Sequence, residues 1–208
     1  MSLLIETIRA DDGRFEELSP HCERMNRTGR VLFGTDKRIR PGAGLEAALQ
    51  KATGSIGEGR WKIRVLYDSI IRRVDVAAYY PRMIGSAALV DGRGIEYSFK
   101  YADRSGLRDL ERRAELSGAD SALIVSEGRI TDFTYANAAF FDGRFWWTPV
   151  EPLLYGTRRS RLLESGVIMT EQITCDDLSN YVSVSPVNAM LELGEIMIDI
   201  KSIKQEII

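Results

Sequence analysis

The sequence predicts an α+β fold arranged in two lobes. Residues 61–68 alternate strictly, with Trp61, Ile63, Val65 and Tyr67 on one face, as in a half-buried strand. Further short apolar runs are separated by turn signals, and segments with helical spacing lie between them. With 208 residues the chain is long enough to bury a core without disulfides. It contains no internal repeat, low-complexity tract or coiled-coil heptad.

The first segment predicts a β-hairpin followed by a helix. Two extended stretches flank Asp11-Asp12-Gly13, a typical tight turn. Ser19 is the expected N-cap of the helix and Pro20 suits its first position, and the helix should run to about Phe33. A second short helix is expected over residues 44–52.

The strand at 61–68 is expected to pair antiparallel with residues 70–80. The pattern then breaks between Pro81 and Gly94, which predicts a lobe boundary, with a small α+β lobe at 1–93 and a larger lobe at 94–208. The larger lobe is expected to contain, in order, a strand at 95–100, a helix at 102–117, strands at 121–126 and 129–133, a hairpin at 138–149 turning at Asp142-Gly143, a helix at 158–164, a strand at 170–174, a helix from Asp176 and a terminal β pair.

Composition excludes several classes of function. The net charge of −2 and pI near 5.6 provide no overall attraction to nucleic acid. The lone His21 argues against a zinc site or a Ser-His-Asp triad, so no metal is expected. Cys22 and Cys175 lack metal or redox spacing and should be buried free thiols. No apolar run is long enough to cross a membrane, and the start lacks a signal-peptide pattern, so a cytoplasmic protein is expected.

Five motifs in a fixed order resemble one enzyme family. They are ETIR followed by HCERM near the start, FKYADR at 99–104, ITDFTYANAAFFDGRFWWTP at 130–149, LLYGTRRSRLL at 153–163 and VSPVNAM at 184–190. Together they resemble the class IV pyridoxal-phosphate-dependent aminotransferases and their lyase relative, aminodeoxychorismate lyase. The resemblance implies a two-lobed fold type IV enzyme. It also implies an N-terminally shortened fold, since the sequence starts at the end of the family's first conserved block, after a turn that usually lines the substrate side of the cleft.

Lys100, at the expected strand end in FKYADR, matches the lysine that carries the cofactor in this family and then moves the substrate proton. An amine suits that role because it loses its charge readily in a desolvated pocket. Asp132 stands where the family usually has the glutamate that keeps the cofactor's ring nitrogen protonated, with a side chain shorter by one methylene. Asn137 matches the asparagine of the same motif and is expected to organise the loop.

The resemblance also implies anchors for the cofactor's phosphate. Arg24 matches the arginine of the family's H-x-x-R motif and could grip phosphate through its forked guanidinium. Gly156 and Thr157 open a predicted helix whose free N–H groups favour an anion. Asn188 and Ala189 resemble a second phosphate-side loop.

Arg64, opposite the apolar face of its strand, stands where members of the family often place a cation for the substrate carboxylate; the resemblance makes it the candidate for that role, and a surface arginine of the strand is the alternative. The run of Arg158, Arg159 and Arg161 is expected to lie mostly on the helix surface, with Arg158 close enough to the phosphate cradle to contribute. His21 is expected to be a packing residue.

Three functions are compatible with these sequence motifs. FKYADR, with Arg104 matching and Asp103 in place of an asparagine, resembles the lyase, which converts 4-amino-4-deoxychorismate to 4-aminobenzoate and pyruvate in the folate pathway. The alternative is a branched-chain or D-amino acid aminotransferase, and the third possibility is a degenerate homologue that binds pyridoxal phosphate or another anion without turnover. The expected partners are a small anionic amino substrate and a second copy of the chain, with Trp146, Trp147 and Tyr155 compatible with a homodimer contact.

Overall fold

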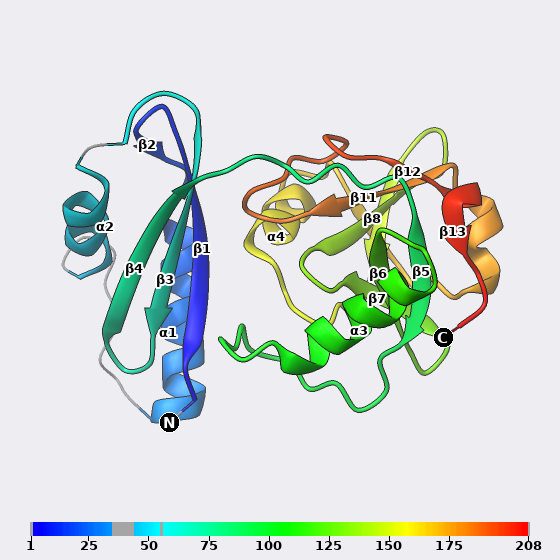
Figure 1. Ribbon diagram of the computed structural model, residues 1–208, viewed down its shortest axis with the longest axis horizontal. Coiled ribbons are helices and arrows are strands. Elements are labelled where there is room, and N and C mark those ends of the chain that lie inside the picture. The colour runs from blue at the N-terminus through cyan, green and yellow to red at the C-terminus, as the bar shows by residue number, and fades with distance from the viewer. Residues whose placement is uncertain (1, 35–43, 55, 208) are drawn as a thin grey trace. The chain divides into compact units, whose positions relative to one another are not determined.

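The computed structural model describes residues 2–34, 44–54 and 56–207, and the chain folds into two compact units (Figure 1). Unit 1 contains Met1–Pro81 and Phe99–Asp103, and unit 2 contains Arg82–Ser98 and Arg104–Ile208. Both combine helices with mostly antiparallel strands, so the predicted α+β class is confirmed.

In its described residues, unit 1 is a four-stranded antiparallel sheet with two helices. Its strands follow the order β2-β1-β3-β4. Alternate residues of β1 and β3 pack against residues of both helices, because a strand turns every second side chain to the same face. The elements are β1 (Leu4–Asp11), β2 (Arg14–Phe15), α1 (Ser19–Phe33), α2 (Leu45–Thr53), β3 (Arg60–Tyr67) and β4 (Ile71–Ala78).

The predicted hairpin and helices of unit 1 are confirmed, with one change at a cap. Asp12 and Gly13 have φ of 48° and 79°, the left-handed pair that a two-residue hairpin turn requires. Helix α1 has the predicted range, but its N-cap is Leu18, and Ser19 instead donates its hydroxyl to Glu23 Oε1 at 3.0 Å.

Unit 2 is built on a mixed nine-stranded sheet. Its main path is β10-β9-β8-β7-β6-β5-β13, and β11 pairs with both β8 and β12. Helix α3 joins the parallel strands β5 and β6 and contacts both of them (Figure 1). The elements are β5 (Ala87–Asp91), α3 (Ser105–Leu116), β6 (Ser121–Ser126), β7 (Arg129–Phe133), β8 (Asn137–Phe141), β9 (Trp146–Pro149), α4 (Thr157–Glu164), β10 (Met169–Glu171), the 3₁₀ helix η1 (Asp176–Asn180), β11 (Ser183–Val187), β12 (Ile198–Asp199), the 3₁₀ helix η2 (Ile200–Ser202) and β13 (Ile203–Lys204).

The segment from 95 to 100 differs from its prediction, since it forms no strand. Its backbone reaches a sheet only at its end, where Ile5 N donates to Lys100 O at 2.9 Å and Ala102 N donates to Leu3 O at 2.8 Å. Phe99 and Tyr101 pack against the core of unit 1. Lys100 therefore belongs to unit 1, and not to the C-terminal lobe that the predicted boundary after residue 93 assigned it to.

Smaller differences concern the second half of unit 2. The hairpin between β8 and β9 turns at Gly143 and Arg144, one residue later than predicted, because Asp142 and Phe145 form the last pair. Asp142 Oδ1 accepts from the N–H groups of Arg144 and Phe145, at 2.7 Å each. The predicted strand at 170–174 is the shorter β10, and the helix after it is the 3₁₀ turn η1.

Candidate functional site

Asp132 is a buried carboxyl group near the end of β7, with a relative exposure of 4%. Asn137 Nδ2 donates to its Oδ1 at 2.7 Å, and Leu154 N donates to its Oδ2 at 2.9 Å. Burial raises the pKa of Asp132 to about 7, although these hydrogen bonds and the charge of Arg159 act in the opposite direction. Near neutral pH this carboxyl group is therefore poised between its two protonation states.

Asn137 joins the Asp132 segment to the loop before α4. Its Nδ2 donates to Leu154 O at 2.8 Å as well as to Asp132. Gly156 lies so close that a Cβ placed there would be 2.1 Å from Asn137 Oδ1, so glycine is the residue that fits. Thr157 is the first residue of α4, which runs for eight residues. The sequence prediction that Asn137 organises this loop agrees with these contacts.

A third loop joins the same region of unit 2. Asn188 Nδ2 donates to Tyr135 O at 3.2 Å, while Asn188 Oδ1 accepts from Met190 N at 2.8 Å and Leu191 N at 3.0 Å. Ala189 is half-buried in this turn. The structure therefore gathers three predicted segments, at 132–137, 153–157 and 188–191.

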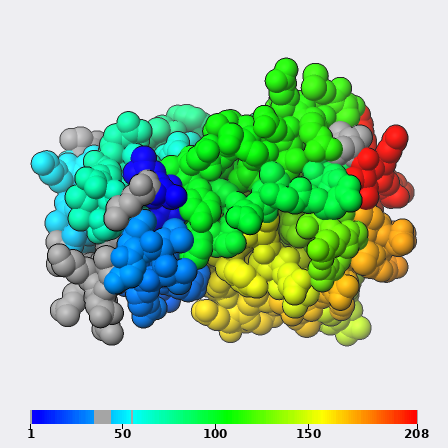
Figure 2. Space-filling view, turned by 90° about the horizontal axis from the view of Figure 1, so that it is seen from below, coloured from blue at the N-terminus to red at the C-terminus, as the bar shows by residue number. Residues whose placement is uncertain are grey.

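Two of the three arginines in α4 are buried, contrary to their prediction as helix surface. Arg159 has 3% exposure because its Nε donates to Thr148 Oγ1 at 3.1 Å and its Nη2 donates to Pro149 O at 2.7 Å. Arg158 pairs with Glu192 at 2.9 Å. Only Arg161 of this run is exposed. The segment from Val150 through α4, yellow in Figure 2, nevertheless reaches the molecular surface at Val150 and Tyr155.

Arg24 lies in unit 1, where its guanidinium pairs with a fully buried carboxylate. Its Nε donates to Glu6 Oε1 at 2.8 Å and its Nη2 contacts Glu6 Oε2, which also bonds His21 Nδ1 at 2.8 Å. Burial opposes ionisation, but the charge of Arg24 and the hydrogen bonds from Arg24 and His21 lower the pKa of Glu6 to about 2. His21 is a packing residue, as expected. The Nε and Nη2 atoms of Arg24, the predicted phosphate-binding arginine, are bound to Glu6.

The remaining predicted residues are also in unit 1. Lys100 is half-buried in the irregular segment that follows Ser98. Arg64 is exposed on β3, on the face away from the core, in register with Asp75 of β4. In unit 2, Trp146 and Trp147 are half-buried, whereas Tyr155 is 54% exposed.

Unit 2 also has a cavity of about 270 Å³ beside β7. It is lined in part by Tyr97, Arg129, Thr131 and Leu153.

The described residues contain no cluster of three or more His, Cys, Asp or Glu that could hold a metal ion. Cys22 is a buried thiol and Cys175 is partly buried. No helix in the described ranges has the length and apolarity needed to cross a membrane.

Comparison with known proteins decides the family. The family model described as amino-transferase class IV matches residues 3–197. The chain belongs to the class IV aminotransferases. The predicted class of enzyme, an aminotransferase or a lyase of this pyridoxal-phosphate-dependent family, is thereby confirmed.

Similar proteins and solved structures support this assignment. An uncharacterised Haemophilus influenzae protein is 29% identical over 187 residues, covering 90% of this chain and 97% of that protein. A crystal structure from Haemophilus somnus 129PT, provisionally named 4-amino-4-deoxychorismate lyase, is 29% identical with a TM-score of 0.83, covering 93% of this chain and 98% of that one. A fold IV transaminase from Curtobacterium pusillum has the same fold, with a TM-score of 0.76 and 18% identity over 99% of this chain and 78% of that one.

Three contributors to these clusters were not found from the sequence. Glu6, in ETIR, has no sequence signal of burial other than its place on the face of β1 shared with Leu4 and Ile8. Arg159 resembles any helix-surface arginine. The donor from Leu154 is a backbone group, which carries no sequence signal.

Proposed function

We propose that this chain is a pyridoxal-phosphate-dependent lyase that converts 4-amino-4-deoxychorismate to 4-aminobenzoate and pyruvate. The observation that carries the cofactor assignment is the buried Asp132 carboxyl group, which accepts from Asn137 Nδ2 and Leu154 N, both of them uncharged donors. An aminotransferase acting on branched-chain or D-amino acids is the alternative, because it would use the same groups.

The chemistry of the residues in unit 2 fits pyridoxal phosphate. A buried carboxyl group with a pKa near 7 gains most from a cationic N–H partner, which a protonated ring nitrogen provides. Gly156 keeps the chain free of a side chain where α4 begins, and the N–H groups at that helix start favour an anion. Asn188 and Ala189 would line the phosphate from a second loop.

Each residue would have a distinct task. When bound, the cofactor supplies an electron sink for the carbon from which the proton leaves. Lys100 would attach the cofactor and then move that proton through its Nζ. Asp132 would hold the proton on the ring nitrogen, Arg24 would contribute to phosphate binding, and Arg64 would orient a substrate carboxylate.

The preference for a lyase rests on two further observations. FKYADR carries Arg104 four residues after Lys100, as in the lyase pattern. The Haemophilus somnus protein, to which this chain is similar over nearly its whole length, is provisionally named for the same lyase activity.

Spectroscopy of the purified protein tests cofactor attachment. Pyridoxal phosphate added to the wild-type protein should produce a visible absorption band, and Lys100→Ala should abolish it. Lys62→Ala is the matched control, since Lys62 is an exposed lysine on β3 of the same unit, and this variant should keep the band. A wild-type protein that gains no band contradicts both enzyme activities.

Two assays then separate the reactions. The first supplies 4-amino-4-deoxychorismate and measures 4-aminobenzoate. The second supplies amino acids with 2-oxoglutarate and measures glutamate. Product in the first assay supports the lyase, whereas product in the second alone supports the aminotransferase.

A further inference from the structure

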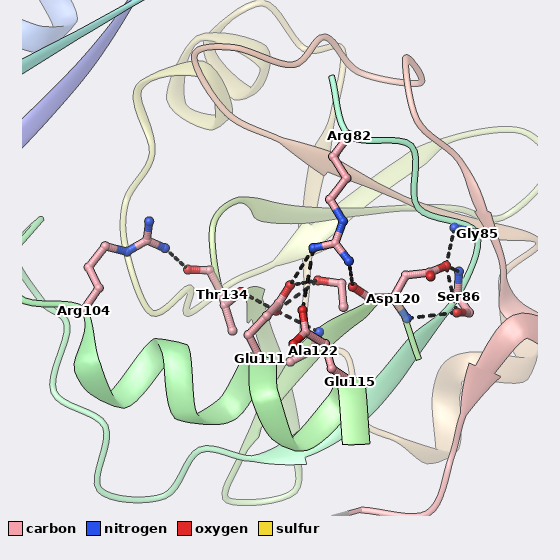
Figure 3. A network of polar contacts seen from close by, with 10 residues as sticks. Arg82, Gly85, Ser86, Arg104, Glu111, Glu115, Asp120, Ala122 and Thr134 are labelled. Carbon is pink, nitrogen blue, oxygen red and sulfur yellow. Dashed lines mark hydrogen bonds and ion pairs between the residues drawn. The ribbon is translucent and has the colours of Figure 1, made fainter. Parts of the chain in front are cut away.

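Thr134 lies two residues after Asp132, in the turn between β7 and β8, and residues of the α3 region hold its hydroxyl and its carbonyl group. Thr134 Oγ1 donates to Glu111 Oε2 at 2.6 Å, and Arg104 Nη2 donates to Thr134 O at 2.6 Å (Figure 3). Thr134 itself is buried, with 7% exposure. The turn that follows Asp132 is therefore held at both its side chain and its backbone.

Glu111 is fixed independently of Thr134. Its Oε2 accepts from Ala122 N at 3.1 Å, and Ser121 Oγ donates to its carboxylate at 3.1 to 3.2 Å. Arg82 lies 3.9 Å away as a longer ion pair (Figure 3). A carboxylate with several donors has little rotational freedom, so Glu111 transmits the position of β6 to Thr134.

The Glu111 contact lies where the pairing of β6 with β7 ends. The β6–β7 ladder shifts register between Leu123 and Val125, and its last pair before the β7–β8 turn is Leu123 with Phe133. The next antiparallel pair would be Ala122 with Thr134. At that position the Glu111 carboxylate accepts from Ala122 N and from Thr134 Oγ1. It therefore links the two strands where their backbone hydrogen bonds end.

We propose that Glu111 is a positioning residue for Asp132 and acts through the Thr134 hydroxyl. An aspartate side chain has only two torsion angles, so the place of its carboxyl group follows closely from its backbone. Asn137 and Leu154 fix the carboxyl group itself, while Glu111 fixes the chain two residues later. This inference rests on the proposed function, in which Asp132 contacts the cofactor's ring nitrogen.

Two substitutions at Thr134 separate positioning from packing. Thr134→Val keeps the shape and removes the hydroxyl, whereas Thr134→Ser keeps the hydroxyl. Thr134→Val should weaken pyridoxal phosphate binding about tenfold, since a hydrogen bond to a charged group is lost, and should shift the pH midpoint of the bound cofactor's visible band. Thr134→Ser should bind with wild-type affinity and keep the wild-type midpoint.

Glu111→Ala should reproduce the spectral shift of Thr134→Val, and the double variant should shift no further than Glu111→Ala alone, because both changes remove the hydrogen bond between Glu111 and Thr134. Arg82→Gln is the control. Arg82 is exposed, its contact with Glu111 is a long ion pair of 3.9 Å, and its other contacts are to Asp120 O and Glu115, so the variant should leave the midpoint unchanged. Unfolding midpoints of all variants, measured without cofactor, show which proteins remain folded.

The outcomes distinguish this inference from the proposed function. A wild-type protein without a visible band removes the proposed function and this inference with it. A wild-type band that Thr134→Val leaves unchanged in affinity and pH midpoint overturns the positioning role alone. Fully additive shifts in the double variant overturn it as well.

Discussion

Each unit contains a buried carboxyl group on a β-strand, and the two groups are stabilised in opposite ways. Glu6 in unit 1 faces the guanidinium of Arg24, and its pKa is lowered to about 2. The Asp132 carboxyl group in unit 2 accepts from an amide side chain and a backbone N–H, with Arg159 acting only through its charge, and its pKa is raised to about 7. Burial alone does not determine the ionisation of a carboxyl group, because the charge of its donors decides it.

This difference indicates different roles. Glu6 already has its counterion and serves the structure of unit 1, where it fixes Arg24 in α1. The charge of Asp132 is incompletely compensated, which is typical of a group that receives a cationic partner from a ligand.

The largest expected effect on the free energy of unfolding comes from neutralising Glu6, whose charge Arg24 compensates. Glu6→Gln leaves the buried Arg24 without its counterion and should lower the free energy of unfolding by about 3–5 kcal/mol. Urea denaturation measures the change. Glu46→Gln, at an exposed position on α2, is the matched control and should remain within about 0.5 kcal/mol of the wild type. Equal small losses in both variants would contradict the structural role of Glu6.

The two carboxyl groups should also respond differently to pH. The folded pKa of Asp132 is raised, so its contribution to stability should fall as pH rises from about 4 to about 7, by up to about 4 kcal/mol. Asp132→Asn should abolish that part of the decline in the cofactor-free protein. Glu6 has a lowered pKa, so its contribution should be lost only as pH falls from about 4.5 towards about 2. Identical pH profiles of wild-type and Asp132→Asn unfolding would show that Asp132 titrates normally.

A smaller effect on stability is expected at Gly156, whose backbone lies close to Asn137. Gly156→Ala places a methyl group 2.1 Å from Asn137 Oδ1, and since φ of Gly156 is −73° the cost is steric. The free energy of unfolding should fall by about 1–3 kcal/mol, and pyridoxal phosphate binding should weaken with it. Gly57→Ala has open space around its Cβ and should leave both quantities unchanged.

The smallest expected effect on stability is at Arg64. Unlike the buried Arg24, Arg64 is exposed, so Arg64→Gln should change the free energy of unfolding by less than about 0.5 kcal/mol. If Arg64 orients the substrate carboxylate, KM should rise while the visible band of the bound cofactor is unchanged. An unaltered KM would remove Arg64 from substrate binding.

Local sequence patterns predicted elements whose structure is set by their own residues. The hairpin at Asp12-Gly13, helix α1 and the alternating strand β3 follow from turn chemistry and periodicity. Residues 95–99 also alternate, with Ile95, Tyr97 and Phe99 at every second position, yet no neighbouring strand pairs with them along their length. A strand needs a partner, and the sequence of one segment does not say where its partner lies.

Within the candidate site, the sequence predicted only those residues that match a family motif. Asp132, Asn137, Gly156 and Asn188 lie in one region of unit 2, as their motifs indicated. The burial of Arg159 depends on Thr148 and on a carbonyl group of Pro149, which become its partners only after folding. The same holds for the contact of Glu111 with Ala122 and Thr134, which lies beyond the last pair of a ladder whose register shift has no sequence marker.

The return of Phe99–Asp103 to unit 1 has a consequence for biosynthesis. The chain passes between the units after residues 81, 98 and 103, so the first unit is not a contiguous stretch of sequence. During translation its β1 edge cannot be completed until residue 103 has left the ribosome, by which time the first strand of unit 2 has also been made. The backbone around Lys100 is thus among the last parts of its unit to be put in place.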